Sequence, residues 1–228
     1  MKDQEMMQLL DGLEREIRHE EAIAAIQNRI RKYAAWFHTG NVDGILSCFA
    51  RTEAPELIFG SSKVSGREAI SQFYGNRPML VRLPGTIVSH EITTEVIVIA
   101  SDEKTARVTA NASGFKGLAP TGSQVNLLGK YSFEMIREDG EWKIWRLQWI
   151  MIADADFNYG WLFQNRSYYL EDEYPALSEE PRPGMLTEAA DSYMDYFKPD
   201  EVQVLLPEPP DEYQTWDGYR AAKNTRGY

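Results

Sequence analysis

The sequence has 228 residues, of which 43% are hydrophobic and 26% are charged, a balance typical of a folded globular protein. The net charge of −11 and the pI of about 4.8 argue against nucleic-acid binding, because an acidic surface repels phosphate backbones. No apolar run reaches the roughly 18–20 residues that a membrane helix requires, so we expect no membrane partner.

The single cysteine, Cys48, excludes an internal disulfide, and its apolar neighbours predict a buried structural thiol. The N-terminal segment is charged throughout and lacks the apolar stretch of a signal peptide. We therefore expect a cytoplasmic protein.

The first forty residues predict a long helix, because apolar side chains recur at three- and four-residue spacing between charged ones. Gly40 suits its C-terminal cap, and Asn41 can cap a second helix over residues 42–50. Pro55 prevents that helix from continuing. The next expected elements are a short strand at residues 56–60 and a third helix at residues 65–77.

The amino-acid composition changes after residue 85, where β-branched residues become frequent. Long strands are predicted at residues 86–100, 105–115, 125–138 and 141–153, the last two joined by a turn at Asp139-Gly140. Three helices followed by antiparallel strands indicate an α+β fold. We expect a cone-shaped, curved antiparallel sheet wrapped around the three helices, with a pocket between them.

The periodicity fades from about residue 156, and residues 156–228 mix tyrosine with proline and acidic side chains. Disordered tails are usually poor in aromatic residues, so we interpret this part as an irregular arm. It is expected to pack on the domain of residues 1–155 or on a neighbouring subunit.

Four segments together resemble SnoaL-like domains of the nuclear-transport-factor-two-like superfamily, over roughly residues 15–153. The match consists of a helix with a tyrosine near its end, a "GREAI" third helix, a strand pair that begins "VSHEI", and a final "GKYSF…DGEWKI" hairpin. The matching segments are residues 25–50, 65–74, 88–108 and 129–147.

The resemblance implies a cone fold with an apolar pocket, and a set of polar residues that lyases, dehydratases, isomerases and cyclases of the family use. Scytalone dehydratase, bile-acid dehydratase, hexachlorocyclohexane dehydrochlorinase and ketosteroid isomerase are the reference cases. Tyr33 matches the helix tyrosine that hydrogen-bonds the substrate, and His90 matches the strand histidine that acts as general base. His38 stands where many members carry the aspartate that pairs with this base.

The two candidate partners of His90 each have an alternative interpretation. His38 is either a second imidazole that exchanges protons with His90 or a helix-end residue stabilised by the helix dipole. Tyr33 is either a donor to the substrate or a half-buried core tyrosine. It lies five residues before His38, or about 140° around the helix, so both reach one pocket only if the pocket wraps the helix end. His90 suits proton abstraction, because the ordinary histidine pKa of about 6.5 lies near neutral pH.

Four further residues are candidate substrate contacts. Alternation along the last strand puts Arg146 and Gln148 on one face with Trp142 and Ile144, and family hairpins point that face inward. The opposite face, with Trp145, Leu147, Trp149 and Met151, would then pack on the arm or on another subunit. The other two candidates are Asn111 in the second long strand and Asp43 at the start of the second helix, which also fits a dipole role.

Together with these residues, the resemblance implies a cofactor-independent lyase of the dehydratase type, which eliminates water or formaldehyde from a hydrophobic, hydroxylated aromatic molecule. The alternatives are an isomerase or cyclase in the same pocket, or a non-catalytic binding module. Three scattered histidines without C-x-x-C or H-x-H spacing predict no metal site, and we expect no cofactor. The apolar outer strand face and the arm predict a homo-oligomer, either a dimer or a trimer.

Overall fold

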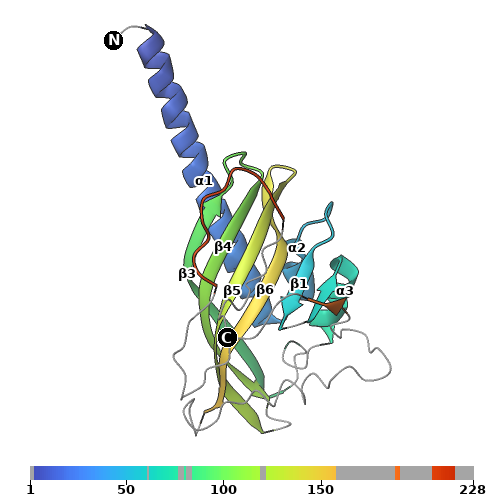
Figure 1. The fold of residues 1–228 in the computed structure, drawn as a ribbon. Coiled ribbons are helices and arrows are strands. Elements are labelled where there is room, and N and C mark those ends of the chain that lie inside the picture. The colour runs from blue at the N-terminus through green and yellow to red at the C-terminus, as the bar shows by residue number, and fades with distance from the viewer. Residues whose placement is uncertain are drawn as a thin grey trace, which may run out of the picture.

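The structure is a computed structural model, and it describes residues 3–60, 62–76, 80, 84–118, 122–157, 188–190 and 207–218. Figure 1 shows one long N-terminal helix, a curved sheet, and two shorter helices at the side of the sheet. Most of the arm predicted for residues 156–228 lies outside the described residues.

The first helix, α1 (Asp3–Thr39), is as long as predicted. Its C-terminal half buries one stripe of apolar side chains against the sheet, namely Ile26, Ile30, Tyr33 and Phe37. The helix ends at Gly40, whose φ of 63° is the left-handed conformation that glycine adopts without strain. Asn41 then caps α2 (Val42–Ser47) by accepting a hydrogen bond from the Gly44 amide, as predicted.

A hairpin precedes the third helix. It consists of β1 (Glu56–Phe59) and β2 (Ser62–Ser65), and α3 (Arg67–Gly75) follows. β1 lies where the sequence predicts a strand, but the predicted third helix overlaps the end of β2, because the polar residues of β2 have no strand-like alternation.

Four long strands form the body of the sheet: β3 (Thr86–Ile99), β4 (Thr105–Leu118), β5 (Ser123–Glu138) and β6 (Glu141–Asp156). The strand order is β3-β4-β5-β6-β1-β2-β7, where β7 is the short strand Glu188–Ala189. The predicted α+β fold is confirmed. The sheet is mixed rather than purely antiparallel, because β1 runs parallel to β6.

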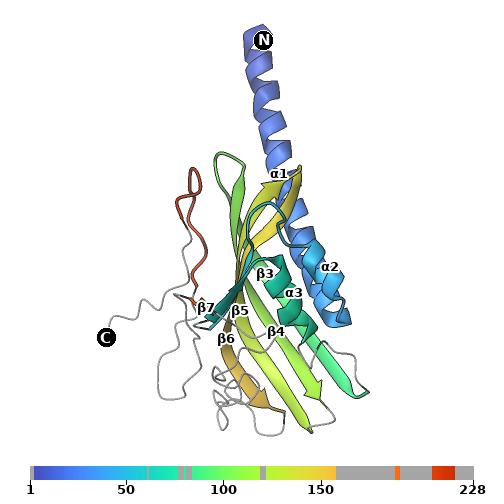
Figure 2. The same ribbon diagram turned by 90° about the vertical axis from the view of Figure 1, so that its right-hand side faces the viewer.

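The two faces of the sheet have different neighbours. All three helices lie on one side, here called the inner face, and residues 207–218 lie on the other side, the outer face (Figure 2). The core is on the inner face, where the buried stripe of α1 packs against apolar side chains of β3 to β6. None of the helices in the described ranges has a stretch long and apolar enough to span a membrane.

A β-bulge at Trp145 decides which face each residue of β6 occupies. Ile144 pairs with Met135, and Arg146 pairs with Glu134, the next residue of β5. Trp145 is therefore an extra residue in β6 that has no partner of its own in the ladder with β5. The extra residue reverses the alternation of the strand as far as Met151, beyond which a second register shift restores it and turns Asp154 inward. Ile144 therefore lies in the core, and so do Leu147, Trp149 and Met151 further along.

Gly114 is a position where the packing requires glycine. A Cβ atom there would overlap the carbonyl oxygen of Ser89 on the adjacent strand. We expect Gly114→Ala to lower the free energy of unfolding by about 2 kcal/mol or more, because β3 and β4 would have to separate. Chemical denaturation measures this. Gly75→Ala is the control, because no atom lies within 4 Å of the added Cβ, and an equal loss in both variants would contradict the explanation.

Candidate active site

His90 points into the interior of the domain from β3. It pairs with Gly114 across the ladder, and Gly114 pairs with Leu127 of the core, so all three lie on the inner face. Its ring is stacked between Phe37 and Trp149, at centroid distances of 4.9 and 5.0 Å. The side chain is 8% exposed, so the imidazole is almost completely enclosed by aromatic rings.

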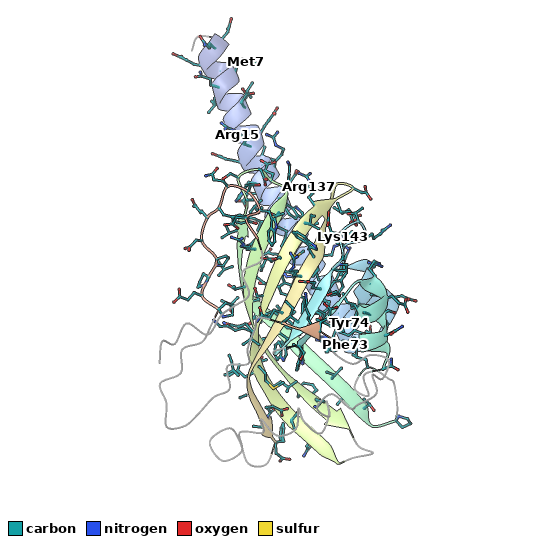
Figure 3. The ribbon with its side chains drawn as sticks, turned by 45° about the vertical axis from the view of Figure 1, so that its right-hand side comes forward. Met7, Arg15, Phe73, Tyr74, Arg137 and Lys143 are labelled. Carbon is teal, nitrogen blue, oxygen red and sulfur yellow. The ribbon has the colours of Figure 1, made fainter. Side chains whose placement is uncertain are left out.

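A chain of hydroxyl groups continues from the imidazole. His90 Nδ1 lies 2.8 Å from the Tyr131 hydroxyl, and Tyr131 is hydrogen-bonded to Tyr33. The Tyr33 hydroxyl in turn lies 2.9 Å from that of Tyr74 on α3 (Figure 3 labels Tyr74). These four buried groups, called here the His–Tyr network, come from β3, β5, α1 and α3 and satisfy one another's hydrogen bonds.

Burial sets the protonation states in the network. Desolvation, assisted by the positive charges of His38 and Lys116, lowers the pKa of His90 from 6.5 to about 3. Burial likewise raises the pKa of Tyr33 and that of Tyr131 well above the usual tyrosine value. At neutral pH the network is therefore uncharged, and its groups act through hydrogen bonds rather than through fixed charge.

His38 contacts the backbone of His90, whereas one of the two interpretations drawn from the sequence paired the two imidazole rings. The His38 Nε2 atom lies 2.9 Å from the His90 amide nitrogen and 2.8 Å from the His90 carbonyl oxygen. An unprotonated Nε2 accepts from the amide, and a protonated Nε2 donates to the carbonyl. β3 stands first in the strand order of the described sheet, so His38 supplies this backbone with a partner where no further described strand pairs with it.

Tyr33 and His38 both reach the neighbourhood of His90 although they point in different directions from α1. Tyr33 faces the middle of the sheet, where it contacts Tyr131, and His38 reaches the edge strand β3. The sheet is curved, as Figure 2 shows, and both its middle and its edge strand are in contact with residues of α1. α1 stays helical through Thr39, so it does not loosen at this point.

The prediction that Arg146 and Gln148 face the interior is wrong, because the bulge at Trp145 reverses the strand. Arg146 lies on the outer face, where it pairs with Glu56 at 2.7 Å and with Glu134 at 3.3 Å. Gln148, two residues further, shares that face and is only 1% exposed. Neither is placed to contact a molecule bound beside His90.

The other two predicted contacts also lie away from His90. Asn111 is exposed on the outer face, between the inward-facing Ala110 and Ala112. Asp43 is exposed in the first turn of α2, where a carboxylate interacts favourably with the helix dipole. Both side chains therefore lie away from His90, and their predicted contacts with a substrate stay predictions.

Three inward-facing polar residues were missed by the sequence analysis. Tyr131 pairs with Trp149 of the core, Lys116 pairs with Val125 of the core, and Asp154 pairs with Leu127 of the core. Lys116 and Asp154 are 5% and 4% exposed. The alternation of β4 could have placed Lys116 on the same face as Ala112, but nothing in the sequence shows that this strand end lies beside His90.

Residues 207–218 cover part of the outer face. Trp216 packs against Trp145 at a centroid distance of 4.7 Å, and Tyr213 lies under the guanidinium of Arg107 at 4.2 Å. Arg107 also pairs with Asp217 at 2.6 Å. Aromatic stacking and ion pairs thus hold this segment on the outer face. Trp145 lies there as predicted, but Leu147, Trp149 and Met151 were predicted on the same face and lie in the core instead, because the bulge reverses the strand.

A cleft of about 220 Å³ lies far from the His–Tyr network, between α1 and the turns that join β3 to β4 and β5 to β6. Its lining includes Arg18, Glu21, Arg137 and Trp142, and none of the residues predicted to contact the substrate. Within the described ranges, His, Cys, Asp and Glu side chains do not gather in any group of three or more that could hold a metal ion.

Comparison with known proteins identifies the family. The sequence profile of the SnoaL-like domain matches residues 18–148, more than half of the 228 residues. The chain belongs to the SnoaL-like domain family. The resemblance inferred from the four sequence segments is therefore confirmed.

Solved structures share the fold of this SnoaL-like domain. A protein of Novosphingobium aromaticivorans assigned as an aromatic ring hydroxylase is 25% identical with a TM-score of 0.51, over 60% of this chain and 93% of that one. A protein of the same species assigned as a scytalone dehydratase is 19% identical (TM-score 0.51, 59% and 87% coverage). The dehydrochlorinase LinA-type3 of Novosphingobium barchaimii LL02 is 17% identical (TM-score 0.54, 62% and 94% coverage).

We predict that Arg146→Gln destabilises the protein and leaves substrate affinity unchanged. Removing the guanidinium deprives the buried Glu134 carboxylate of a close cation, which we expect to lower the free energy of unfolding by about 2 kcal/mol. Arg18→Gln is the control, because its ion pair with Glu14 is exposed and contributes about 0.5 kcal/mol or less. Denaturant titration gives the stability, and a raised KM with unchanged stability would contradict the structural role.

The lowered pKa of the buried His90 predicts that the stability of the protein depends on pH. The native protein keeps His90 neutral down to about pH 3, whereas an unfolded histidine binds a proton near 6.5. Between these values the unfolded state holds more protons, so stability falls as the pH falls, by up to about 1.4 kcal/mol per pH unit from this group. We measure the free energy of unfolding by denaturation at several pH values between 7 and 4. We expect the stability of His90→Gln to fall less steeply with falling pH than that of the unchanged protein. The stability of His19→Gln, on the exposed part of α1, should fall as steeply as that of the unchanged protein, and parallel curves for all three proteins would contradict the prediction.

Proposed function

We propose that this SnoaL-like protein is a cofactor-independent lyase that eliminates water or formaldehyde from a hydrophobic, hydroxylated aromatic molecule. The observation that carries the proposal is the His90 imidazole, which is neutral, faces inward, and is held at Nδ1 by the Tyr131 hydroxyl. A neutral imidazole fixed at one nitrogen can exchange a proton at the other.

The tautomer of His90 determines its role. If Nδ1 carries the proton and donates it to the Tyr131 oxygen, Nε2 is free to accept a proton from the substrate. Tyr131 then orients the ring, which is the function that an aspartate performs in His–Asp pairs. Unlike a carboxylate, the neutral Tyr131 hydroxyl contributes no negative charge to stabilise an imidazolium.

The low pKa of His90 fits a proton that is taken and returned within one reaction. Each pKa unit corresponds to about 1.4 kcal/mol, so the imidazolium is disfavoured by several kcal/mol at neutral pH. Once formed beside a departing oxygen, this cation is a strong acid and returns its proton to that oxygen. In loss of water, His90 would remove a proton from carbon, the C=C bond would form as the C–O bond breaks, and the proton would pass to the departing hydroxyl. In loss of formaldehyde, His90 would remove the proton of a CH2–OH group, the C=O bond would form as the C–C bond breaks, and the proton would pass to the carbon that keeps the electron pair. His90 ends neutral in both cases.

Two groups are candidates to hold the substrate oxygens. The Tyr33 and Tyr74 hydroxyls form one end of the network and can donate to a carbonyl or phenolic oxygen. Lys116 lies on the inner face one side-chain row from His90, and its positive charge acts on the His90 ring. An ammonium group there would stabilise a phenolate or a developing oxyanion, so Lys116 takes the role that the sequence analysis gave to Arg146.

The test is turnover of a panel of aromatic alcohols and diols, followed by mass spectrometry. A product lighter by one water or one formaldehyde supports the lyase, a product of unchanged mass supports an isomerase or cyclase, and binding without any product supports a non-catalytic module.

We expect His90→Gln to lower kcat by about 10²–10⁴-fold, the usual contribution of a positioned acid or base. Tyr131→Phe removes one hydroxyl and should lower kcat less, since it frees the ring without removing it. His19→Gln should retain full activity. Full turnover by a folded His90→Gln protein would rule out the proposed mechanism.

A further inference from the structure

The N-terminal half of α1 extends beyond the domain and carries most of its exposed apolar side chains. Figures 1 and 3 show this half of the helix projecting past the ends of the long strands, with the labelled Met7 and Arg15 on it. Six of the eleven large apolar side chains that are exposed in the described residues belong to it: Met6, Met7, Leu9, Leu10, Leu13 and Ile17. Such a concentration of exposed apolar surface is typical of an interaction site.

Four of these residues form a continuous strip along the helix, which we call the N-terminal stripe: Met6, Leu10, Leu13 and Ile17. Their alternating spacing of four and three residues keeps them within an arc of about 60°, at 100° per residue. Between 41% and 58% of each side chain is exposed. This is the pattern of a helix that packs along another helix.

The N-terminal stripe cannot be covered by the surface that α1 already packs against. The buried positions Ile26, Ile30, Tyr33 and Phe37 lie on a side of the helix that is roughly 160° away from the stripe, at 100° per residue. The stripe therefore faces away from the side on which the sheet lies. An occupant must approach α1 from the opposite side.

The charges beside the stripe restrict what the occupant can be. Glu14 and Glu21 flank the stripe on one side, and Glu5 and Glu16 flank it on the other. Arg15 lies on the far side of the helix, and Arg18 is directed toward Glu14. The stripe is thus an apolar strip with acidic borders.

We propose that the N-terminal stripe is the docking surface for an amphipathic helix of a different protein, whose apolar face is bordered by lysine or arginine. Apolar side chains of the two helices would interdigitate, and the basic borders of the partner would pair with the flanking glutamates. This interaction is independent of the chemistry at His90 and adds a binding function to the protein.

A second copy of the chain does not fit the stripe. Pairing two identical helices, either parallel or antiparallel, places the glutamates of one border against glutamates of the other helix. An anionic lipid surface is excluded by the same charges, because membrane-surface helices carry basic rather than acidic polar faces.

The experiment uses the full-length protein and two synthetic helical peptides with the same leucine positions, one bordered by lysine and one by glutamate. Fluorescence anisotropy measures binding, and sedimentation velocity measures stoichiometry. We expect one lysine-bordered peptide per chain, and binding of the glutamate-bordered peptide to be at least about tenfold weaker, a difference of about 1.4 kcal/mol.

Three variants distinguish the contribution of the apolar side chains of the stripe from the contribution of the flanking charges. Leu10→Glu/Leu13→Glu should weaken binding of the lysine-bordered peptide at least about tenfold. Gln8→Glu/Gly12→Glu adds the same charge on the opposite side of the same helix, so it should leave binding intact, with circular dichroism confirming that both variants stay helical. Glu14→Lys/Glu16→Lys should reverse the preference toward the glutamate-bordered peptide.

Several results would overturn the proposal. Equal binding of both peptides, or equal losses in the Leu10→Glu/Leu13→Glu and Gln8→Glu/Gly12→Glu variants, would show that the stripe does not select its partner. Self-association of the free chain that Leu10→Glu/Leu13→Glu abolishes would identify a second copy as the occupant. Binding to neutral phosphatidylcholine vesicles that the same variant abolishes would identify a lipid surface.

Discussion

Polar groups buried in the interior of this domain must find their hydrogen-bond partners there, because an unpaired buried group costs about 1–3 kcal/mol. The imidazole of His90 and the hydroxyls of Tyr33, Tyr74 and Tyr131 meet this requirement together. Each comes from a different element, so the helices and the sheet must assume their relative positions before the network can form. The network therefore links the stability of the fold to the geometry of the candidate active site.

The same requirement organises the outer face of the sheet. Arg146 and Arg107 lie there with Glu134 between them, and aromatic rings of residues 207–218 cover part of them. The bulge at Trp145 separates the two systems, because it sends the arginine outward and returns Leu147 to the core. One extra residue in β6 thus decides whether Arg146 lies on the inner or on the outer face of the sheet.

His38 stands where the resemblance implies an aspartate, and its contact differs from the pair of rings that one interpretation of the sequence proposed. His38 interacts with the backbone of His90, and Tyr131 contacts its ring. A neutral partner in a desolvated site favours chemistry in which His90 carries a positive charge only briefly. This is why an elimination with internal return of the proton fits the site better than a mechanism with a persistent imidazolium.

The sequence by itself determined the α+β class, the long first helix and its caps, the long strands and the family, because these depend on local periodicity and on short motifs. It also singled out Tyr33 and His90, although their catalytic roles stay predictions. Only the tertiary structure decided the faces of β6, the partners of His90 and the inward position of Lys116. Alternation predicts faces only in an unbroken strand, and contacts between distant strands depend on register and curvature, which no local pattern of residues encodes.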